Sequence, residues 1–272
     1  MRTPAPRSWL LVATLLLLGA GGAQAATIGY WRMETDLDPS ANGFEVANEV
    51  AFGTSLLSSE AFVDTLANPS GTVPLTGAPN GGSAGATLQG GPNGINATAA
   101  WYPELDVSSI TVEFWARTVE GQATLFSRSS GNNGIVIANP NSLDVSYWVE
   151  DGLGGATQVQ LLDLFDLDAN WHHFAFGYDA AAGLGRFWVD GAVVASNDGP
   201  DGRSLVWGNQ VDVRVGWQMD YAAAFNGTLD EVRILDAAPG AGATLLIAEP
   251  APAVLAAAGS LGLLALGRRR RT

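Results

Sequence analysis

The sequence predicts an all-β fold, a two-sheet antiparallel sandwich of the jelly-roll type, and three observations support it. Between Thr27 and Ile247 we find no convincing amphipathic helix pattern. Short β-rich runs recur there instead with turn signals between them, and about a dozen runs within ~200 residues are typical of two packed sheets. The composition agrees, because 34 glycines and only 15% charged residues favour strands and turns over surface helices.

The predicted strands follow one another along this body of the chain, with one long interruption. The interrupting stretch, Asn68–Gly94, is rich in Gly and Pro and has no clear period. We expect it to be either a surface excursion beside a binding site or a disordered insertion. The predicted strands are Ile28–Met33, Ile95–Tyr102, Ile110–Arg117, Gln122–Ser127, Gly134–Ala138, Leu143–Glu150, Thr157–Leu161, His172–Tyr178, Arg186–Val189, Ala192–Ser196, Val211–Gly216 and Thr228–Leu235.

The strand that begins at His172 illustrates how the two faces are predicted. A period of two places His172, Phe174 and Phe176 on one face and His173 on the other. The chain has only 2 histidines. Because they point to opposite faces, they cannot complete one zinc site, and we expect them to pack and hydrogen-bond within the sheet. Asp190-Gly191 further along is a tight-turn signal of a hairpin.

Composition and charge exclude several classes of function. The absence of cysteine excludes disulfide scaffolds, thiolate metal sites and cysteine nucleophiles, and the absence of lysine excludes Schiff-base lysine chemistry. Six of the 13 arginines lie at the two ends, which leaves seven in the body against 27 acidic residues, a net charge of −20. Such a body repels nucleic acid and attracts divalent cations, although solubility in a salty exterior explains the charge equally well.

Residues 1–25 have the three parts of a secretory signal peptide. Arg2 and Arg7 give a positive start, Trp9–Leu18 is an apolar run, and Ala23-Gln24-Ala25 matches an A-x-A cleavage site. We therefore exclude this segment from the fold. The apolar run is shorter than the ~20 residues that span a bilayer, which disfavours a retained anchor. Export without cysteine indicates a bacterial protein that does not rely on disulfides.

Residues 248–272 have the layout of a tail that holds an exported body at the membrane. Ala248, Glu249 and Pro250 precede the apolar stretch Ala253–Gly267, which is of marginal length for a transmembrane helix. Four arginines follow it and would stay cytoplasmic by the positive-inside rule. They are Arg268, Arg269, Arg270 and Arg271.

This order of motif, apolar stretch and arginine cluster resembles the PEP-CTERM sorting tail of Gram-negative bacteria. The first Pro of the Pro-Glu-Pro motif is replaced by Ala248, and an ordinary short anchor is the alternative. The resemblance implies that an exosortase enzyme cleaves near the motif. It also implies a link to exopolysaccharide and biofilm matrix, and hence a place on the outer surface after a transient stay at the inner membrane.

Four segments of the body carry a second family pattern: Tyr30–Glu34, Ile110–Arg117, Trp171–Gly191 and Phe225–Ile234. Together they resemble LamG-like domains of the concanavalin A-like lectin/glucanase superfamily. Order and spacing match across nearly the whole body, so residues 26–247 are expected to form one such domain. The resemblance implies a jelly-roll sandwich that often binds calcium and presents loops to glycans or proteins, without fixing a single ligand.

Catalysis has weak support in the residues. A retaining glycosidase needs two carboxyls about 5–5.5 Å apart, and the superfamily commonly supplies three acids at alternate strand positions. Glu104 and Asp106 begin like that pattern, but Ser109 stands near where the third acid would fall. No Gly-x-Ser-x-Gly elbow occurs. Three aspartates in loop-like sequence are expected to be solvated: Asp163, Asp166 and Asp168. No catalytic residue is predicted.

A structural calcium site is the better-supported metal hypothesis, because calcium takes 6–8 oxygen ligands. Glu34, Asp36 and Asn42 supply oxygens within one short segment, and Asp230 lies in the last predicted strand. First and last strands of a sandwich are commonly neighbours, so these four residues are expected to converge. The alternative is that Glu34, Asp36 and Asn42 are ordinary surface groups around a turn.

Tryptophans are the candidate ligand contacts. Most of the eight in the body lie within predicted strands and are expected in the core. Trp207 and Trp217 lie beside loops, with Tyr221 nearby, and could stack on sugar rings. The sequence therefore predicts an exported, surface-directed, non-catalytic module that binds a polysaccharide or matrix protein. A divergent glycoside hydrolase or lyase and a purely structural biofilm-matrix protein are the alternatives.

Overall fold

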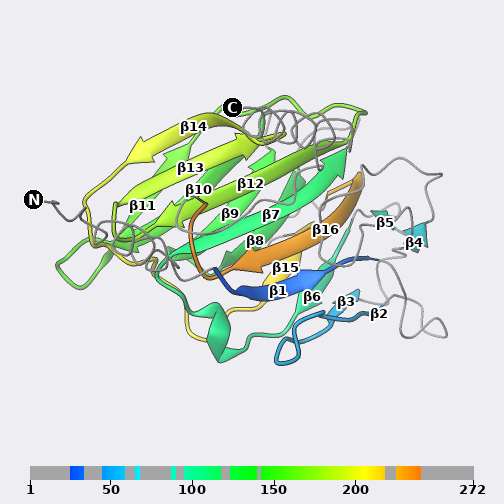
Figure 1. Cartoon of the computed structure of the whole chain (residues 1–272), viewed down its shortest axis with the longest axis horizontal. Helices are drawn as coiled ribbons and strands as arrows, with labels where there is room; N and C mark the ends of the chain where they lie inside the picture. Colours follow the sequence, from blue (N-terminus) through cyan, green and yellow to red (C-terminus); the bar gives the residue numbers. More distant parts are fainter. Residues whose placement is uncertain are drawn as a thin grey trace, which may run out of the picture.

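Two antiparallel sheets lie face to face in the computed structural model (Figure 1). The structure describes residues 25–33, 45–58, 65–67, 87–89, 95–117, 123–139, 142–217 and 225–239. Sheet A, in front in Figure 1, consists of β14 (Ala192–Asp198), β13 (Leu184–Val189), β12 (His172–Asp179), β7 (Ile110–Arg117), β16 (Thr228–Leu235), β5 (Thr87–Gln89) and β4 (Thr65–Ala67), with β1 (Thr27–Trp31) also paired to β16.

Sheet B lies behind sheet A and closes the sandwich (Figure 1). Its strands in order are β11 (Ala156–Leu161), β10 (Asp144–Glu150), β9 (Gly134–Asn139), β8 (Ala123–Ser129), β15 (Val213–Val215), β6 (Ala97–Ala99), β3 (Leu56–Ser58) and β2 (Glu45–Val46). A single turn of 3-10 helix, η1 (Pro103–Leu105), stands between β6 and β7. The predicted all-β two-sheet fold is therefore confirmed for the described residues.

Each of the twelve predicted strands is found, and β7 and β16 have the predicted bounds. The predicted strand Ile95–Tyr102 was too long, because the chain turns into η1 at Pro103 and only β6 pairs. Four strands were missed, β2 to β5, since two or three residues are too few to display a period of two. One of them, β5, lies inside the stretch Asn68–Gly94 and pairs with β16, so that stretch is not wholly irregular.

The core lies between the sheets and follows the predicted alternation. On β12, Phe174 and Phe176 are completely buried among core residues, whereas His173 points to the outer face of sheet A. Trp31 is also completely buried and donates its indole N–H to the carbonyl of Thr54 at 3.0 Å. Full burial of one such apolar side chain is worth about 1.5–3 kcal/mol, so each of these aromatic residues contributes substantially to the stability of the sandwich.

The hairpin from β13 to β14 shows the predicted tight turn. Asp190 and Gly191 have φ angles of 50° and 79°. Two successive positive φ angles are the geometry of a type I′ turn, whose twist matches that of the strands. The Asp190 carboxylate also accepts the backbone N–H of His173 at 2.9 Å, which ties the turn to the neighbouring strand.

Four buried tyrosines make the stability of the domain sensitive to alkali. Burial raises the pKa of Tyr102 to about 12, and it also raises the pKa values of Tyr30, Tyr147 and Tyr178. The folded state therefore favours the neutral phenol. The stability that these groups contribute is fully present below their unfolded pKa of about 10 and is lost as the pH rises through the folded values.

We expect these phenols to leave the free energy of unfolding unchanged up to about pH 9 and to lower it from about pH 10 upward. Tyrosinate absorbance should appear together with the loss of β-sheet circular dichroism in a pH titration. Ionisation of most tyrosines near pH 10 in a still folded domain would contradict the buried positions of these phenols.

The two targeting segments, residues 1–25 and 248–272, lie outside the described residues except for Ala25. Among the residues that the structure does describe, no helix is both long and apolar enough to cross a membrane. The signal peptide and the sorting tail therefore stay predictions.

Candidate ligand-binding site

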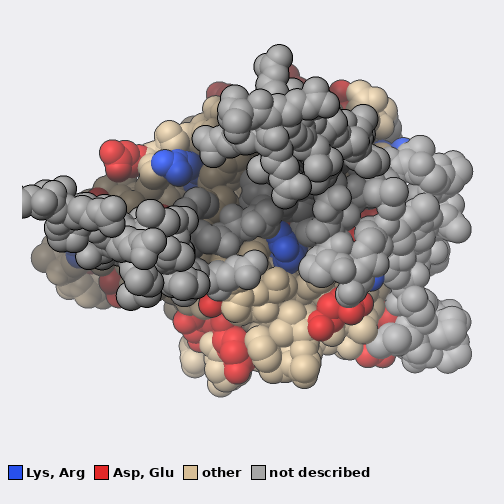
Figure 2. Space-filling model, viewed as in Figure 1, with Lys and Arg blue, Asp and Glu red and all other residues tan. Residues whose placement is uncertain are grey.

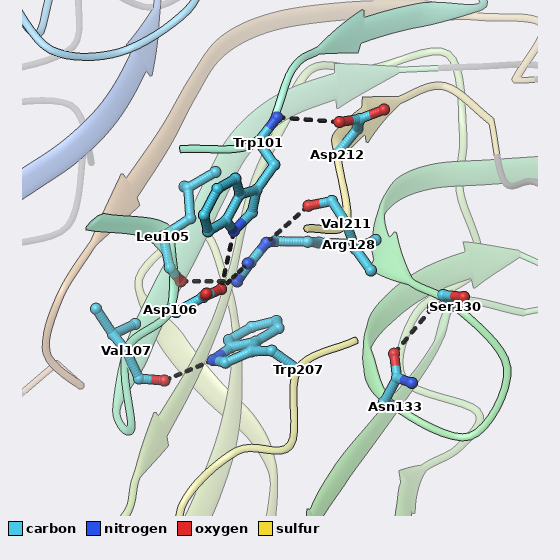
Figure 3. Close-up of polar contacts among 10 residues, drawn as sticks. All are labelled: Trp101, Leu105, Asp106, Val107, Arg128, Ser130, Asn133, Trp207, Val211 and Asp212. Carbon is cyan, nitrogen blue, oxygen red and sulfur yellow. Dashed lines mark hydrogen bonds and ion pairs between the residues drawn. The ribbon is translucent and has the colours of Figure 1, made fainter. Parts of the chain in front are cut away.

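Three loops that are far apart in the sequence meet at one end of the sandwich, around Arg128 (Figure 3). They are the connection from β6 to β7, the turn from β8 to β9, and the segment before β15. We call Trp101, Asp106, Arg128 and Trp207 the rim cluster. In the view of Figure 3, Trp101 and Trp207 lie above and below the Arg128 guanidinium.

Arg128 organises this end of the molecule from the core side of sheet B. It pairs across the ladder with Ile135, a core residue, and is only 1% exposed. Its Nη1 donates to the carbonyl of Leu105 at 2.7 Å, its Nε donates to the carbonyl of Val211 at 3.3 Å, and its Nη2 forms an ion pair with Asp106. One guanidinium thus links the β6–β7 connection to the segment before β15, next to the turn that follows β8.

A buried guanidinium needs compensation, and Asp106 supplies it. Burial lowers the pKa of Arg128, while the hydrogen bond and the charge of Asp106 act in the opposite direction. Arginine remains charged in proteins, so the guanidinium keeps its positive charge at all ordinary pH values. The Asp106 side chain is 40% exposed, so its carboxylate also faces solvent.

The two tryptophans of the rim cluster are fixed by their indole N–H groups. Trp207 donates to the carbonyl of Val107 at 2.7 Å, and its ring lies 4.0 Å from the Arg128 guanidinium carbon. Trp101 donates to Asp106 at 3.2 Å, while its backbone N–H donates to Asp212 at 3.0 Å. Both side chains are half-buried, so part of each ring remains accessible at the rim.

The turn from β8 to β9 has the backbone geometry that the rim cluster requires. Gly134 has a φ of +88°, and a Cβ there would come within 1.9 Å of the Arg128 carbonyl oxygen. Only glycine permits this close approach. Within the turn, Ser130 donates its backbone N–H to the Asn133 side chain at 3.1 Å. The turn therefore returns the chain directly beside Arg128.

The predicted ligand contacts Trp207 and Trp217 lie on opposite sides of sheet B. Trp217 donates its indole N–H to the carbonyl of Ala97 at 3.1 Å, and its ring lies 5.2 Å from the Arg214 guanidinium carbon. Arg214 alternates with the core residues Val213 and Val215, so it faces outward, whereas Arg128 faces the core. The structure therefore does not unite the two tryptophans, and Tyr221 lies outside the described residues.

Of the predicted calcium ligands, the structure describes Asp230 alone, whereas Glu34, Asp36 and Asn42 lie outside the described residues. Asp230 is 2% exposed, and its carboxylate accepts the backbone N–H of Glu231 at 2.8 Å. The expected pairing of first and last strands is confirmed, with Trp31 registered opposite Val232. Within the described ranges, no group of three or more His, Asp or Glu residues could hold a metal ion.

The acidic residues weighed for catalysis lie in irregular backbone. Glu104 belongs to η1, so it does not alternate with Asp106 along a strand, and Asp106 is paired with Arg128. The expected exposure of three aspartates is confirmed for Asp163, Asp166 and Asp168. Backbone and side-chain hydrogen bonds from Asn170 lower the pKa of Asp168, which keeps it ionised.

The histidines take the places that the alternation predicts. His172 lies toward the core side, where its ring is 4.7 Å from Phe165 and its Nδ1 is 2.8 Å from the Asp190 carboxylate. His173 lies on the outer face of sheet A, with its Nε2 3.0 Å from the Glu113 carboxylate. Both roles are packing and hydrogen bonding, as expected.

A buried charged network on that outer face was missed by the sequence analysis. Glu113, Arg233 and His173 come from the adjacent strands β7, β16 and β12, and Glu113 binds both of the others. The period of β7 could have shown that Glu113 faces away from the core. The register of three strands was needed to find its partners.

Comparisons with known proteins agree with this architecture. The family model described as "Concanavalin A-like lectin/glucanases superfamily" matches residues 80–242. Among curated proteins none matches the chain. The binding domain of Paraclostridial Mosquitocidal Protein 1 is 12% identical with a TM-score of 0.52, over 78% of this chain and 49% of that one. The binding domain of Botulinum neurotoxin serotype D is 10% identical with a TM-score of 0.51, over 78% and 48%.

A third similar structure is Domain 4 of AbnA, a GH43 extracellular arabinanase from Geobacillus stearothermophilus, in complex with arabinotriose. It is 15% identical with a TM-score of 0.49, over 79% of this chain and 94% of that one. This chain spans about half the length of the two toxin binding domains. At such low identity the likeness to those two domains shows the sandwich fold alone.

Proposed function

The chain belongs to the concanavalin A-like lectin/glucanases superfamily, and we propose that it is an exported, non-catalytic module that binds carbohydrate at the rim cluster. The observation that carries this proposal is the arrangement of two half-buried tryptophans around one partly exposed carboxylate. The solved structures of similar fold, two of them titled as binding domains, agree with a binding role.

The rim cluster can recognise a sugar through two complementary contacts. The accessible part of an indole ring offers an apolar surface on which the C–H face of a pyranose can pack. The Asp106 carboxylate accepts hydrogen bonds and can receive sugar hydroxyls, which are good donors. Arg128 is too deeply buried to touch a ligand. Its role is to hold Asp106 and the Trp207 ring in place, so that little ordering is needed on binding.

A binding experiment on residues 26–247 tests this proposal. A glycan array identifies the ligand, and calorimetry then compares three variants. Trp101→Ala should lower affinity about tenfold or more, equal to ~1.4 kcal/mol, while Trp101→Phe keeps a ring and should stay within about threefold. Trp217→Ala serves as the matched control on the other side of sheet B. If Trp217→Ala lost binding while Trp101→Ala kept full affinity, the glycan would bind elsewhere than at the rim cluster, and the proposed site would be wrong.

An enzyme of the same superfamily, a divergent hydrolase or lyase, is the alternative function. Hydrolysis assays on every polysaccharide that the domain binds distinguish the two, and turnover of any of them would overturn the non-catalytic proposal. A purely structural matrix protein is the third possibility, and it would bind no glycan on the array.

We propose further that export and sorting follow from the two end segments. The arginines Arg268 to Arg271 would hold the C-terminus at the inner face of the membrane until an exosortase-type enzyme processes the chain near Ala248-Glu249-Pro250. Deleting the four arginines should then leave unprocessed protein in the membrane fraction of the producing cell. Mass spectrometry of released protein decides the matter, since peptides that extend to Thr272 would contradict cleavage.

A further inference from the structure

The strand β11 ends sheet B with an open and exposed edge (Figure 1). Among the described residues it forms a ladder with β10 alone, and the register runs without a shift from Ala156 to Leu161. The strand contains no charged residue, no proline and no glycine. Most of its side chains are exposed, those of Ala156, Thr157, Gln158 and Gln160. An edge strand with these properties can pair with a strand of another chain.

The other strands that end the two sheets carry features that hinder such pairing. β2 has 2 residues and β4 has 3, and very short strands offer little to pair with. β1 and β14 are longer, but the ladder of each contains a register shift, and β14 ends in Asp198. Bulges and charged side chains both protect a sheet edge. Among the strands that the structure describes, only β11 therefore ends a sheet with a long, regular and uncharged edge.

The backbone groups on the open side of β11 can be assigned from its neighbour β10. Glu150 donates its backbone N–H to residue 204 at 3.0 Å, and the carbonyl of Trp148 accepts from residue 206 at 2.9 Å. Segment 204–206 borders β10 on the side away from β11. The partners of these two residues on β11, Ala156 and Gln158, therefore point their own backbone groups away from β10. Every second residue of β11 presents an N–H and a C=O to the open edge.

A second copy of β11 fits this edge in an antiparallel register. With a two-fold axis at Val159, Gln158 of each copy lies opposite Gln160 of the other, and their backbone groups point toward each other. Residues paired in this way exchange two N–H···O bonds. The register also matches the faces, because both glutamines lie on the outer face, whereas Thr157, Val159 and Leu161 lie on the core side. Thr157 of one copy would face Leu161 of the other.

The charge of the molecule restricts where a second copy can approach. The body carries a net charge of −20, and on the face drawn in Figure 2 acidic side chains gather along the lower part of the described surface. Two such bodies repel each other over most of their surface. Residues 155–162 contain no charge, and a basic partner would find none to pair with there. The next acidic residue, Asp163, has a φ of 55°, so the chain leaves the strand direction at that point.

We propose that two copies of the chain associate through β11 and join their B sheets into one continuous antiparallel sheet. The same register places Leu162, which is 54% exposed, opposite Ala156 of the second copy and so covers an apolar side chain. One pair of short strands makes a small interface, so the dimer forms at micromolar or higher concentration. The association requires neither a glycan nor the rim cluster.

Sedimentation velocity of residues 26–247 over a concentration series tests the proposal, and we expect a monomer–dimer equilibrium. Gln158→Pro removes an N–H that points to the open edge and leaves the bonds to β10 in place. It should raise the dissociation constant about tenfold or more while the circular dichroism spectrum stays unchanged. Leu57→Gln is the matched control, because Leu57 is 51% exposed on β3, near the other end of sheet B. It should leave the dissociation constant unchanged.

A charge swap tests the register itself. Gln158→Glu combined with Gln160→Glu sets like charges opposite each other, and so does Gln158→Lys combined with Gln160→Lys. Each double variant alone should dimerise about tenfold more weakly or worse, whereas an equimolar mixture should recover the dimer because opposite charges then face each other. A wild-type chain that stays monomeric up to millimolar concentration would overturn the proposal. So would a dimer that no β11 variant weakens, one that Leu57→Gln weakens equally, or a mixture that recovers nothing.

Discussion

Replacing Glu113 by alanine is expected to lower the free energy of unfolding by about 3–5 kcal/mol, the usual cost of removing one partner from a buried ion pair. Glu113 is 0% exposed and binds Arg233 and His173, which come from the strands on either side of it. Its removal leaves the Arg233 charge and the His173 ring nitrogen in the sheet without the acceptor that they share.

Urea unfolding monitored by circular dichroism measures this loss, and a thermal melt gives a second readout. A domain of this size loses roughly 2–4 °C in Tm for each kcal/mol. Glu113→Gln keeps an acceptor oxygen for both partners, so its free energy of unfolding should fall less than that of Glu113→Ala. Glu104→Ala is the control, because Glu104 is exposed on η1 and a surface change is usually within about 0.5 kcal/mol. A Glu113→Ala variant as stable as Glu104→Ala would contradict the role of this network.

Removal of calcium is expected to have the second largest effect, if Glu34, Asp36 and Asn42 bind a cation together with Asp230. The carboxylates of this set repel one another without a cation, and a bound divalent ion reverses that repulsion. Binding to the folded state alone adds RT ln(1 + [L]/Kd), about 2.7 kcal/mol at a hundredfold excess over Kd. We therefore propose that the domain melts at a lower temperature in chelator and recovers in millimolar calcium.

Three comparisons separate a specific calcium site from a general salt effect. Asp230→Asn keeps an oxygen for the backbone N–H of Glu231 but removes the charge, and it should abolish the calcium response. Asp166→Ala removes an exposed carboxylate elsewhere and should leave the response intact. Magnesium at equal ionic strength should raise the melting temperature much less than calcium does, because magnesium demands a smaller octahedral shell. Equal shifts with both ions, or a full response in Asp230→Asn, would contradict the site.

The sequence by itself determined the fold class and most strand positions. Alternation along β12 predicted that Phe174 and Phe176 enter the core while His173 leaves it, and the structure agrees. Such patterns are readable because every second side chain of a half-buried strand must be apolar. The first and last strands were also expected to be neighbours, and β1 pairs with β16. Strands of two or three residues carry no such pattern, so β2 to β5 could not be found in this way.

The sites depended on pairings that only the tertiary structure decides. The sequence analysis ended a strand at Ser127, whereas β8 continues to Ser129 and places Arg128 on the core side. Its partners Asp106 and Val211 come from loops 22 and 83 residues away. Trp207 and Trp217 looked alike in sequence, yet sheet B separates them. Local patterns report which face a residue takes, while register and loop packing determine which residues meet there. Those long-range contacts assemble the rim cluster and the network around Glu113.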